Sequence, residues 1–213
     1  MQQRLVVWFV LRRRRWRRLT AVPAAADLAV PWLRRLFTEK PWAQLAWPVV
    51  AMLVGLPARW LLGHASQRLC IVPRTPAGLL GILTAPFLHA NLAHLSANLP
   101  PFVVLGALVL QKGSQRFVET AAVVVLGTGL LVWLFARRGA HLGASGVVFG
   151  FFGYLVGLGL FLHTTSDLLI AVLVLLAYGG LLLGLRPARG QTSWEAHLFG
   201  FTVGLAKVWW LRR

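Results

Sequence analysis

The chain is 213 residues long, 58% of its residues are hydrophobic, 13% are charged, and its formal net charge at pH 7 is +17. Soluble domains carry about 25% charged residues, so this composition excludes an ordinary soluble protein and indicates several membrane spans. The positive charge does not indicate nucleic-acid binding, because no aromatic-basic platform or docking motif accompanies the arginines. The single cysteine, Cys70, excludes an intramolecular disulfide.

The first forty residues are predicted to form a basic tail. Arginines gather at positions 12–15 and 17–18, behind an apolar run over 5–11. That run is too short to span a membrane and precedes the charges, which is the wrong order for a cleavable signal peptide. We expect the tail to meet anionic membrane lipids or to fix the orientation of the chain. The predicted domains are this tail over 1–40 and a helical membrane domain over 41–213.

Six apolar stretches follow, each close to the ~20 residues that a helix needs to cross the hydrocarbon. They predict an all-α membrane protein with spans over 42–62, 91–111, 117–136, 143–163, 167–186 and 192–211. The connection over about 62–90 is long and only partly apolar, which favours a functional loop in the membrane interface. With the N-terminus inside, fifteen lysines and arginines lie on the inner side and seven on the outer side. The positive-inside rule therefore predicts both termini in the cytoplasm.

This topology brings polar residues of three spans to one depth. Ser145 lies near the start of the fourth span and His197 near the start of the sixth. His94 and Asn98 lie near the start of the second. These three spans run from outside to inside, so at 1.5 Å per residue all four side chains lie within roughly 10 Å of the outer helix ends. Polar residues inside spans are candidates for function, because burying them without hydrogen bonds is costly.

A serine and a histidine that meet are the minimum for an activated nucleophile. Ser145 lies in a first helical turn, whose free backbone N–H groups can bind an oxyanion. Small residues favour close packing of the two helices that carry the pair; they are Gly143 and Gly146 around the serine, and Gly200 and Gly204 on the face of His197. Alternatively, the serine bonds its own backbone and the histidine is a core residue bonded to a carbonyl.

His94 and Asn98 are spaced i, i+4, so both can donate hydrogen bonds to one developing negative charge. The alternative is that both bond to neighbouring backbone. His89 lies five residues before His94, about 140° around a helix, which predicts a place at the rim. None of the five acids lies mid-span, and Glu195 is about 200° around the helix from His197, so we expect a dyad without a carboxylate. No metal-binding pattern is present, and no metal or cofactor is expected.

These motifs, in this order, resemble those of the rhomboid intramembrane serine proteases. The resemblance covers about residues 75–210 and includes the words Leu-Thr-Ala-Pro-Phe-Leu-His and Ser-Trp-Glu-Ala-His-Leu-Phe-Gly. It implies that Ser145 is the nucleophile, that His197 is its general base, and that His94, Asn98 and the Ser145 backbone N–H hold the oxyanion. It also implies an auxiliary role for His89 and places Phe149 where a tyrosine often lies beneath the catalytic histidine. Leu80-Gly81 stands where many members have Trp-Arg, so the long loop can differ.

The implied function is that of a serine endopeptidase in a bacterial plasma membrane, with six helices in a rhomboid-like bundle. Its substrates would be single-span transmembrane proteins, cut near the outer face at a site that water reaches through a cavity open to the outside. An inactive homologue that binds transmembrane clients is the alternative, although this chain keeps the serine, the histidine and both donors. A small transporter or channel would need ionisable residues mid-span and pseudo-symmetric halves, and the sequence has neither.

Overall fold

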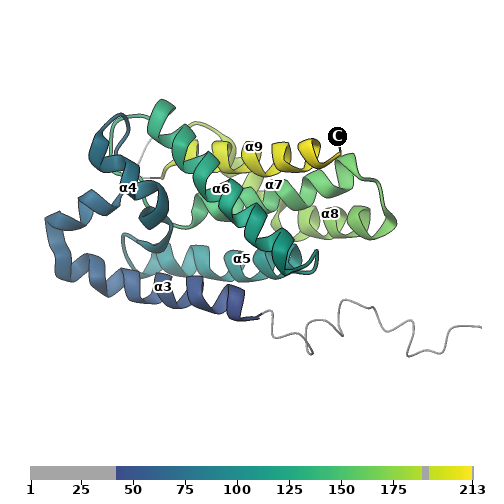
Figure 1. Cartoon of the computed structure of the whole chain (residues 1–213), viewed down its shortest axis with the longest axis horizontal. Coiled ribbons are helices and arrows are strands. Elements are labelled where there is room, and N and C mark those ends of the chain that lie inside the picture. Colours follow the sequence, from purple (N-terminus) through teal and green to yellow (C-terminus); the bar gives the residue numbers. More distant parts are fainter. Residues whose placement is uncertain (1–41, 189–191, 213) are drawn as a thin grey trace, which may run out of the picture. The chain divides into compact units, whose positions relative to one another are not determined.

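The computed structural model describes residues 42–188 and 192–212, which are helical (Figure 1). The predicted basic tail lies outside the described residues. Within them no strand is present, and one isolated antiparallel bridge pairs Ile71 with His141. The elements are α3 (Trp42–Leu62), η1 (Gly63–Leu69), α4 (Pro76–Thr84), η2 (Ala85–Phe87), α5 (Leu92–Leu110), α6 (Ser114–Phe135), α7 (Ser145–Phe161), α8 (Thr165–Tyr178), η3 (Gly179–Leu185) and α9 (Trp194–Leu211).

Four of the six expected spans have helical segments that are long and apolar enough to cross a membrane. These are the segments over 42–69, 92–110, 114–135 and 165–185. The other two expected spans correspond to α7, a shorter apolar helix of 17 residues, and to α9, which has 18 residues and carries Glu195 and Lys207. The helix ends lie within three residues of the predicted span ends with one exception, since α8 ends eight residues before position 186 and η3 continues it to Leu185.

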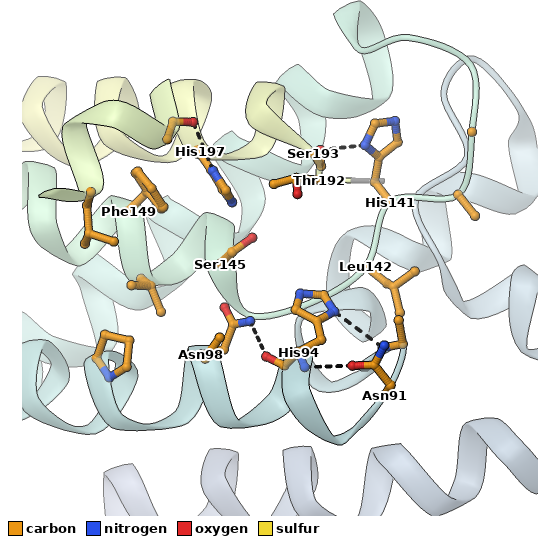
Figure 2. A pocket seen from close by; sticks show the side chains of 18 of the residues that line it. Asn91, His94, Asn98, His141, Leu142, Ser145, Phe149, Thr192, Ser193 and His197 are labelled. Atoms are coloured by element: carbon orange, nitrogen blue, oxygen red, sulfur yellow. Dashed lines mark hydrogen bonds between the residues drawn. The ribbon is translucent and has the colours of Figure 1, made fainter. Parts of the chain in front are cut away.

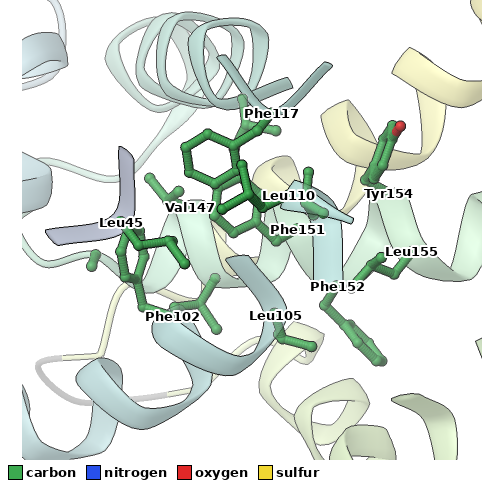
Figure 3. Packing of buried hydrophobic residues seen from close by; sticks show 14 of the residues in the cluster. Leu45, Phe102, Leu105, Leu110, Phe117, Val147, Phe151, Phe152, Tyr154 and Leu155 are labelled. Carbon is green, nitrogen blue, oxygen red and sulfur yellow. The ribbon is translucent and has the colours of Figure 1, made fainter. Parts of the chain in front are cut away.

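The central element is α7, in which every residue from Gly146 to Gly159 is buried. The helix is apolar on all sides, so it is stable only when other helices surround it. It contacts α5, α6, α8 and α9. Its aromatic residues Phe151 and Phe152 form the middle of the core, and Phe151 stacks in tilted geometry on Phe102 of α5 and Phe117 of α6 (Figure 3).

The expected packing of two glycine-lined helices is confirmed for α7 and α9. A methyl group at Gly200 would lie 2.2 Å from the carbonyl oxygen of Gly146, and one at Gly204 would lie 1.9 Å from that of Gly150. Both distances are far inside van der Waals contact, so the two backbones touch where a side chain would hold them apart. This contact sets the distance between the helix that begins with Ser145 and the helix that carries His197.

The long connection over 62–90 is more ordered than a loop. It contains η1, α4 and η2, and α4 begins at a Thr75 cap whose side chain accepts a hydrogen bond from the Gly78 N–H. The helix packs on α6 so closely that a methyl group at Gly129 would lie 2.5 Å from the Ile82 side chain. The Arg74 side chain holds this region to the end of α6, since it donates to the carbonyl oxygens of Leu134 and Ala136, at 2.9 Å each.

Candidate active site

A cavity of about 770 Å³ opens where the first turns of α5, α7 and α9 come together (Figure 2). Residues of η3 and of the segment between α6 and α7 complete its lining. Five of the residues singled out in the sequence line it together, namely His94, Asn98, Ser145, Phe149 and His197. The three helices start at this cavity.

Ser145 is the first residue of α7 and is half-buried in the cavity wall. The turn before it depends on Gly143, which has φ +110 and donates its backbone N–H to the Ala85 carbonyl at 2.9 Å. A methyl group at Gly143 would lie 2.7 Å from Cε1 of His94. Glycine is therefore required here twice, once for the backbone conformation and once for the imidazole that packs against it.

His197 is held by a backbone carbonyl and by an aromatic ring. Its Nδ1 lies 3.1 Å from the carbonyl oxygen of Gly184 in η3. A carbonyl oxygen only accepts hydrogen bonds, so Nδ1 carries the proton and Nε2 keeps its lone pair. The imidazole stacks on Phe149 with ring centroids 4.1 Å apart and an interplanar angle of 4°. The structure thus fixes both the tautomer and the plane of the ring.

His94 and Asn98 lie on one face of α5, opposite the wall formed by α9 (Figure 2). The Asn91 side chain caps this helix and accepts the His94 backbone N–H at 2.8 Å. The His94 Nδ1 accepts the Ala90 N–H at 3.4 Å, which leaves Nε2 as the protonated nitrogen. The amide of Asn98 donates one N–H to the His94 carbonyl at 2.7 Å and has a second to offer.

His89 does not lie at the rim, and that prediction is wrong. Its side chain is fully buried, and its Nε2 accepts the backbone N–H of Ala144 at 3.4 Å. The helical-wheel angle used for the prediction does not apply, because α5 begins only at Leu92 and His89 precedes it. Burial lowers the pKa of His89 to about 4, with the neighbouring His94 as a second cause. His89 therefore supports, in its neutral form, the turn that presents Ser145.

Three further residues join the segment before Ser145 to the start of α9, and the sequence analysis missed them. The ring of His141 lies 2.6 Å from the Ser193 hydroxyl through Nδ1 and 2.9 Å from the Arg137 carbonyl through Nε2. Ser193 caps α9 and accepts the Ala196 N–H at 3.4 Å. Arg137 forms an ion pair with Glu195, at 3.4 Å between its Nε and the carboxylate. Two features of the sequence could have indicated them: His141 lies two residues before Gly143, and Ser193 precedes an acid in the first turn of a helix, as N-cap residues often do.

Glu195, two residues before His197, pairs with Arg137. Its Oε1 also accepts the backbone N–H of Arg137 at 3.3 Å. No group of three histidine, cysteine or acidic side chains that could hold a metal ion exists among the described residues. Within residues 42–188 and 192–212, Ser145 and His197 face the same cavity without a hydrogen bond between them. Such contacts are often loose in an unliganded site.

Comparisons with known proteins find similar sequences. A family model described as "Rhomboid domain" matches residues 76–213. Uncharacterized proteins of Mycobacterium tuberculosis and Mycobacterium bovis are each 41% identical over 150 residues, covering 66% of this chain and 62% of each relative. An uncharacterized protein of Mycobacterium leprae is 40% identical over 142 residues, covering 62% of this chain and 56% of that protein. The chain thus spans less than two thirds of the length of these relatives.

Proposed function

Because the chain belongs to the rhomboid family, we propose that it is an intramembrane serine endopeptidase that acts through Ser145 and His197. It is an integral membrane protein, with several apolar helices long enough to cross a membrane. The observation that carries the proposal is that Ser145, His197, His94 and Asn98 line one cavity, in which the Nδ1–H of His197 faces the Gly184 carbonyl. A base needs a free lone pair near its nucleophile, and this tautomer leaves one on Nε2.

The proposed reaction is acyl transfer. The Ser145 hydroxyl attacks the scissile carbonyl carbon and passes its proton to Nε2 of His197, which becomes an imidazolium stacked on Phe149. The backbone N–H of Ser145, the protonated Nε2 of His94 and the Asn98 amide then donate to the oxyanion. His197 returns the proton to the leaving amine, and a water that enters the cavity repeats the sequence on the acyl-enzyme.

The Gly184 carbonyl replaces the carboxylate of a triad in this scheme. It holds the reactive tautomer and its dipole stabilises the imidazolium, but it supplies less electrostatic stabilisation than an ionised acid would. The Phe149 ring contributes the second constraint, since it fixes the imidazole plane by stacking. Together these groups orient the base without burying a negative charge in a membrane, which would be costly.

The proposal extends to topology and substrates. Both termini lie in the cytoplasm, six helices cross a bacterial plasma membrane, and the cavity opens to the outer side. The substrates are single-span transmembrane proteins whose helix unwinds near the outer interface. The composition of the cavity supports this, because polar groups of α5, α7 and α9 lie at one end of otherwise apolar helices.

The test is cleavage of a model transmembrane substrate by the purified protein in liposomes, with a fluorophosphonate probe as a second readout. Ser145→Ala and His197→Ala should each reduce the cleavage rate by at least ~10³-fold, and Ser145→Ala should abolish labelling by the probe. Ser166→Ala is the matched control, since Ser166 is an exposed serine outside the cavity. Substrate binding without cleavage or labelling would instead identify an inactive homologue.

A further inference from the structure

Among the described residues, the cavity is lined by three arginines and by no carboxylate. Arg59 reaches it from the end of α3, and Arg137 and Arg138 come from the segment between α6 and α7. Cations at a membrane site are usually paired with acids of the same chain. An excess of positive charge in a cavity walled by apolar helices creates a potential that attracts anionic groups.

The acids of the described residues are already used elsewhere. Asp167 pairs with Lys112, and Glu119 pairs with Lys207 at 3.6 Å. The third acid, Glu195, pairs with Arg137 at 3.4 Å. No carboxylate among residues 42–188 and 192–212 therefore remains for the other two cavity arginines.

Arg59 is a half-buried cation with one hydrogen-bond acceptor and no acidic partner among the described residues. Its Nη1 donates to the carbonyl of Ala90 at 3.2 Å, and its Nε is buried without an acceptor. A guanidinium has five N–H donors in a planar fork that fits the two oxygens of a carboxylate. Arg59 lines the cavity, so a carboxylate that enters it can accept from the terminal N–H groups of this guanidinium.

The position of Arg59 relates it to the reacting groups. The Ala90 carbonyl that anchors it is one residue before Asn91, the cap of the helix that carries His94 and Asn98. Arg138 lines the same cavity from the segment that Arg137 ties to the start of α9 through the Thr192 carbonyl and Glu195. A chain that meets Ser145 thus enters a cavity whose lining includes both cations.

We propose that Arg59 binds an acidic side chain of the substrate close to the scissile bond, with Arg138 adding to the attraction. This inference rests on the proposed function, since the bound chain is the one that Ser145 cuts. A substrate fits the observations better than a lipid headgroup does, because the cavity that Arg59 lines also contains Ser145.

The test uses a set of transmembrane substrates that differ only by Asp, Asn or Lys at each of the positions flanking the cut. For the wild-type chain, kcat/KM at the best position should be at least about tenfold higher for Asp than for Asn, as for other hydrogen bonds to a charged group. Arg59→Gln should bring that ratio close to one, Arg59→Lys should leave part of it, and Arg138→Gln should reduce it less. Arg68→Gln, which removes an exposed arginine outside the cavity, should leave the ratio unchanged.

Binding measurements separate this inference from the proposed function. With the Ser145→Ala chain, the Kd of the Asp substrate should be lower than that of the Asn substrate, and Arg59→Gln should remove the difference. Cleavage of all substrates at equal rates would leave the protease proposal intact and overturn the acidic preference. Tighter binding of the Asp substrate without any cleavage would support the acidic preference and overturn the protease proposal. An effect of Arg59→Gln that appears only in vesicles containing phosphatidylglycerol would assign Arg59 to lipid and also overturn the proposal.

Discussion

Replacing Gly184 by alanine should reduce catalysis without reducing stability. The added methyl group would lie 2.9 Å from Cζ of Phe149 and 3.3 Å from Nδ1 of His197. Optimal carbon–carbon contacts are about 3.5–4.0 Å, so the stacked rings must shift by roughly 0.6–1.1 Å. Displacements of about 1 Å at a reacting group cost on the order of 10²-fold in rate, and we expect a loss of kcat of that size.

The stability of the same variant should change little or rise slightly. None of the residues of η3 is buried, so this segment can move outward and relieve part of the strain on the two buried rings. Alanine is also favoured over glycine in helical backbone by up to about 1 kcal/mol. A lower kcat together with an unchanged or higher stability would distinguish a displaced base from a damaged fold.

The assay is the steady-state cleavage of a transmembrane substrate together with thermal unfolding in the same detergent. Gly179→Ala is the matched control, because it lies in the same 3-10 segment and its added methyl group would have no neighbour within 4 Å. If Gly184→Ala cleaved as fast as Gly179→Ala, the orientation of His197 by η3 would not matter and our account of the dyad would be wrong.

Three other predictions concern the frame around the site. Gly204→Ala should lower the free energy of unfolding by about 1–3 kcal/mol, because its methyl group would lie 1.9 Å from the Gly150 carbonyl; thermal unfolding should show no such loss for Gly180→Ala, where the space is open. The pKa of His89 is lowered to about 4 from 6.5, so the unfolded chain binds more protons than the folded one between these values. Stability from this group is complete above pH 6.5 and is lost as the pH falls towards 4; His89→Asn should make the melting temperature less dependent on pH there, and an unchanged slope would contradict the assignment. Ser193→Ala should lower the free energy of unfolding by about 1 kcal/mol, because the cap of α9 is lost. It should also lower kcat, since it removes the partner of His141. A loss of stability with unchanged kcat would limit the role of Ser193 to capping.

The sequence patterns predicted the positions of residues correctly in the parts of the chain that are helical. The apolar stretches marked the helices, because a helix in hydrocarbon needs about 20 apolar residues and leaves that length in the sequence. The spacing of Gly200 and Gly204 predicted the contact with α7, because residues three and four apart share a helical face. The stacking of Phe149 on His197 followed the family resemblance.

The failures lie in the segments between helices. His89 was predicted at the rim by an angle that assumes a helix, but the chain is extended there and turns the imidazole inward beneath Ala144. The connection over 62–90 gave no clear period, and its helix α4 is stabilised by contacts with α6 that are distant in the sequence. His141 and Arg137 were missed for the same reason, since their partners lie more than fifty residues away.

The amino-acid sequence by itself determined that this is a helical membrane protein of the rhomboid type, and which serine and histidine are its candidates for catalysis. Composition, hydrophobic periodicity and short motifs carry this information, because each is visible within a few helical turns of sequence. Only the tertiary structure decided that the Gly184 carbonyl orients His197 and that Arg59 is left without an acid in the cavity. Both depend on which distant backbone or side-chain groups remain for pairing once the helices have packed, and no local pattern contains that information.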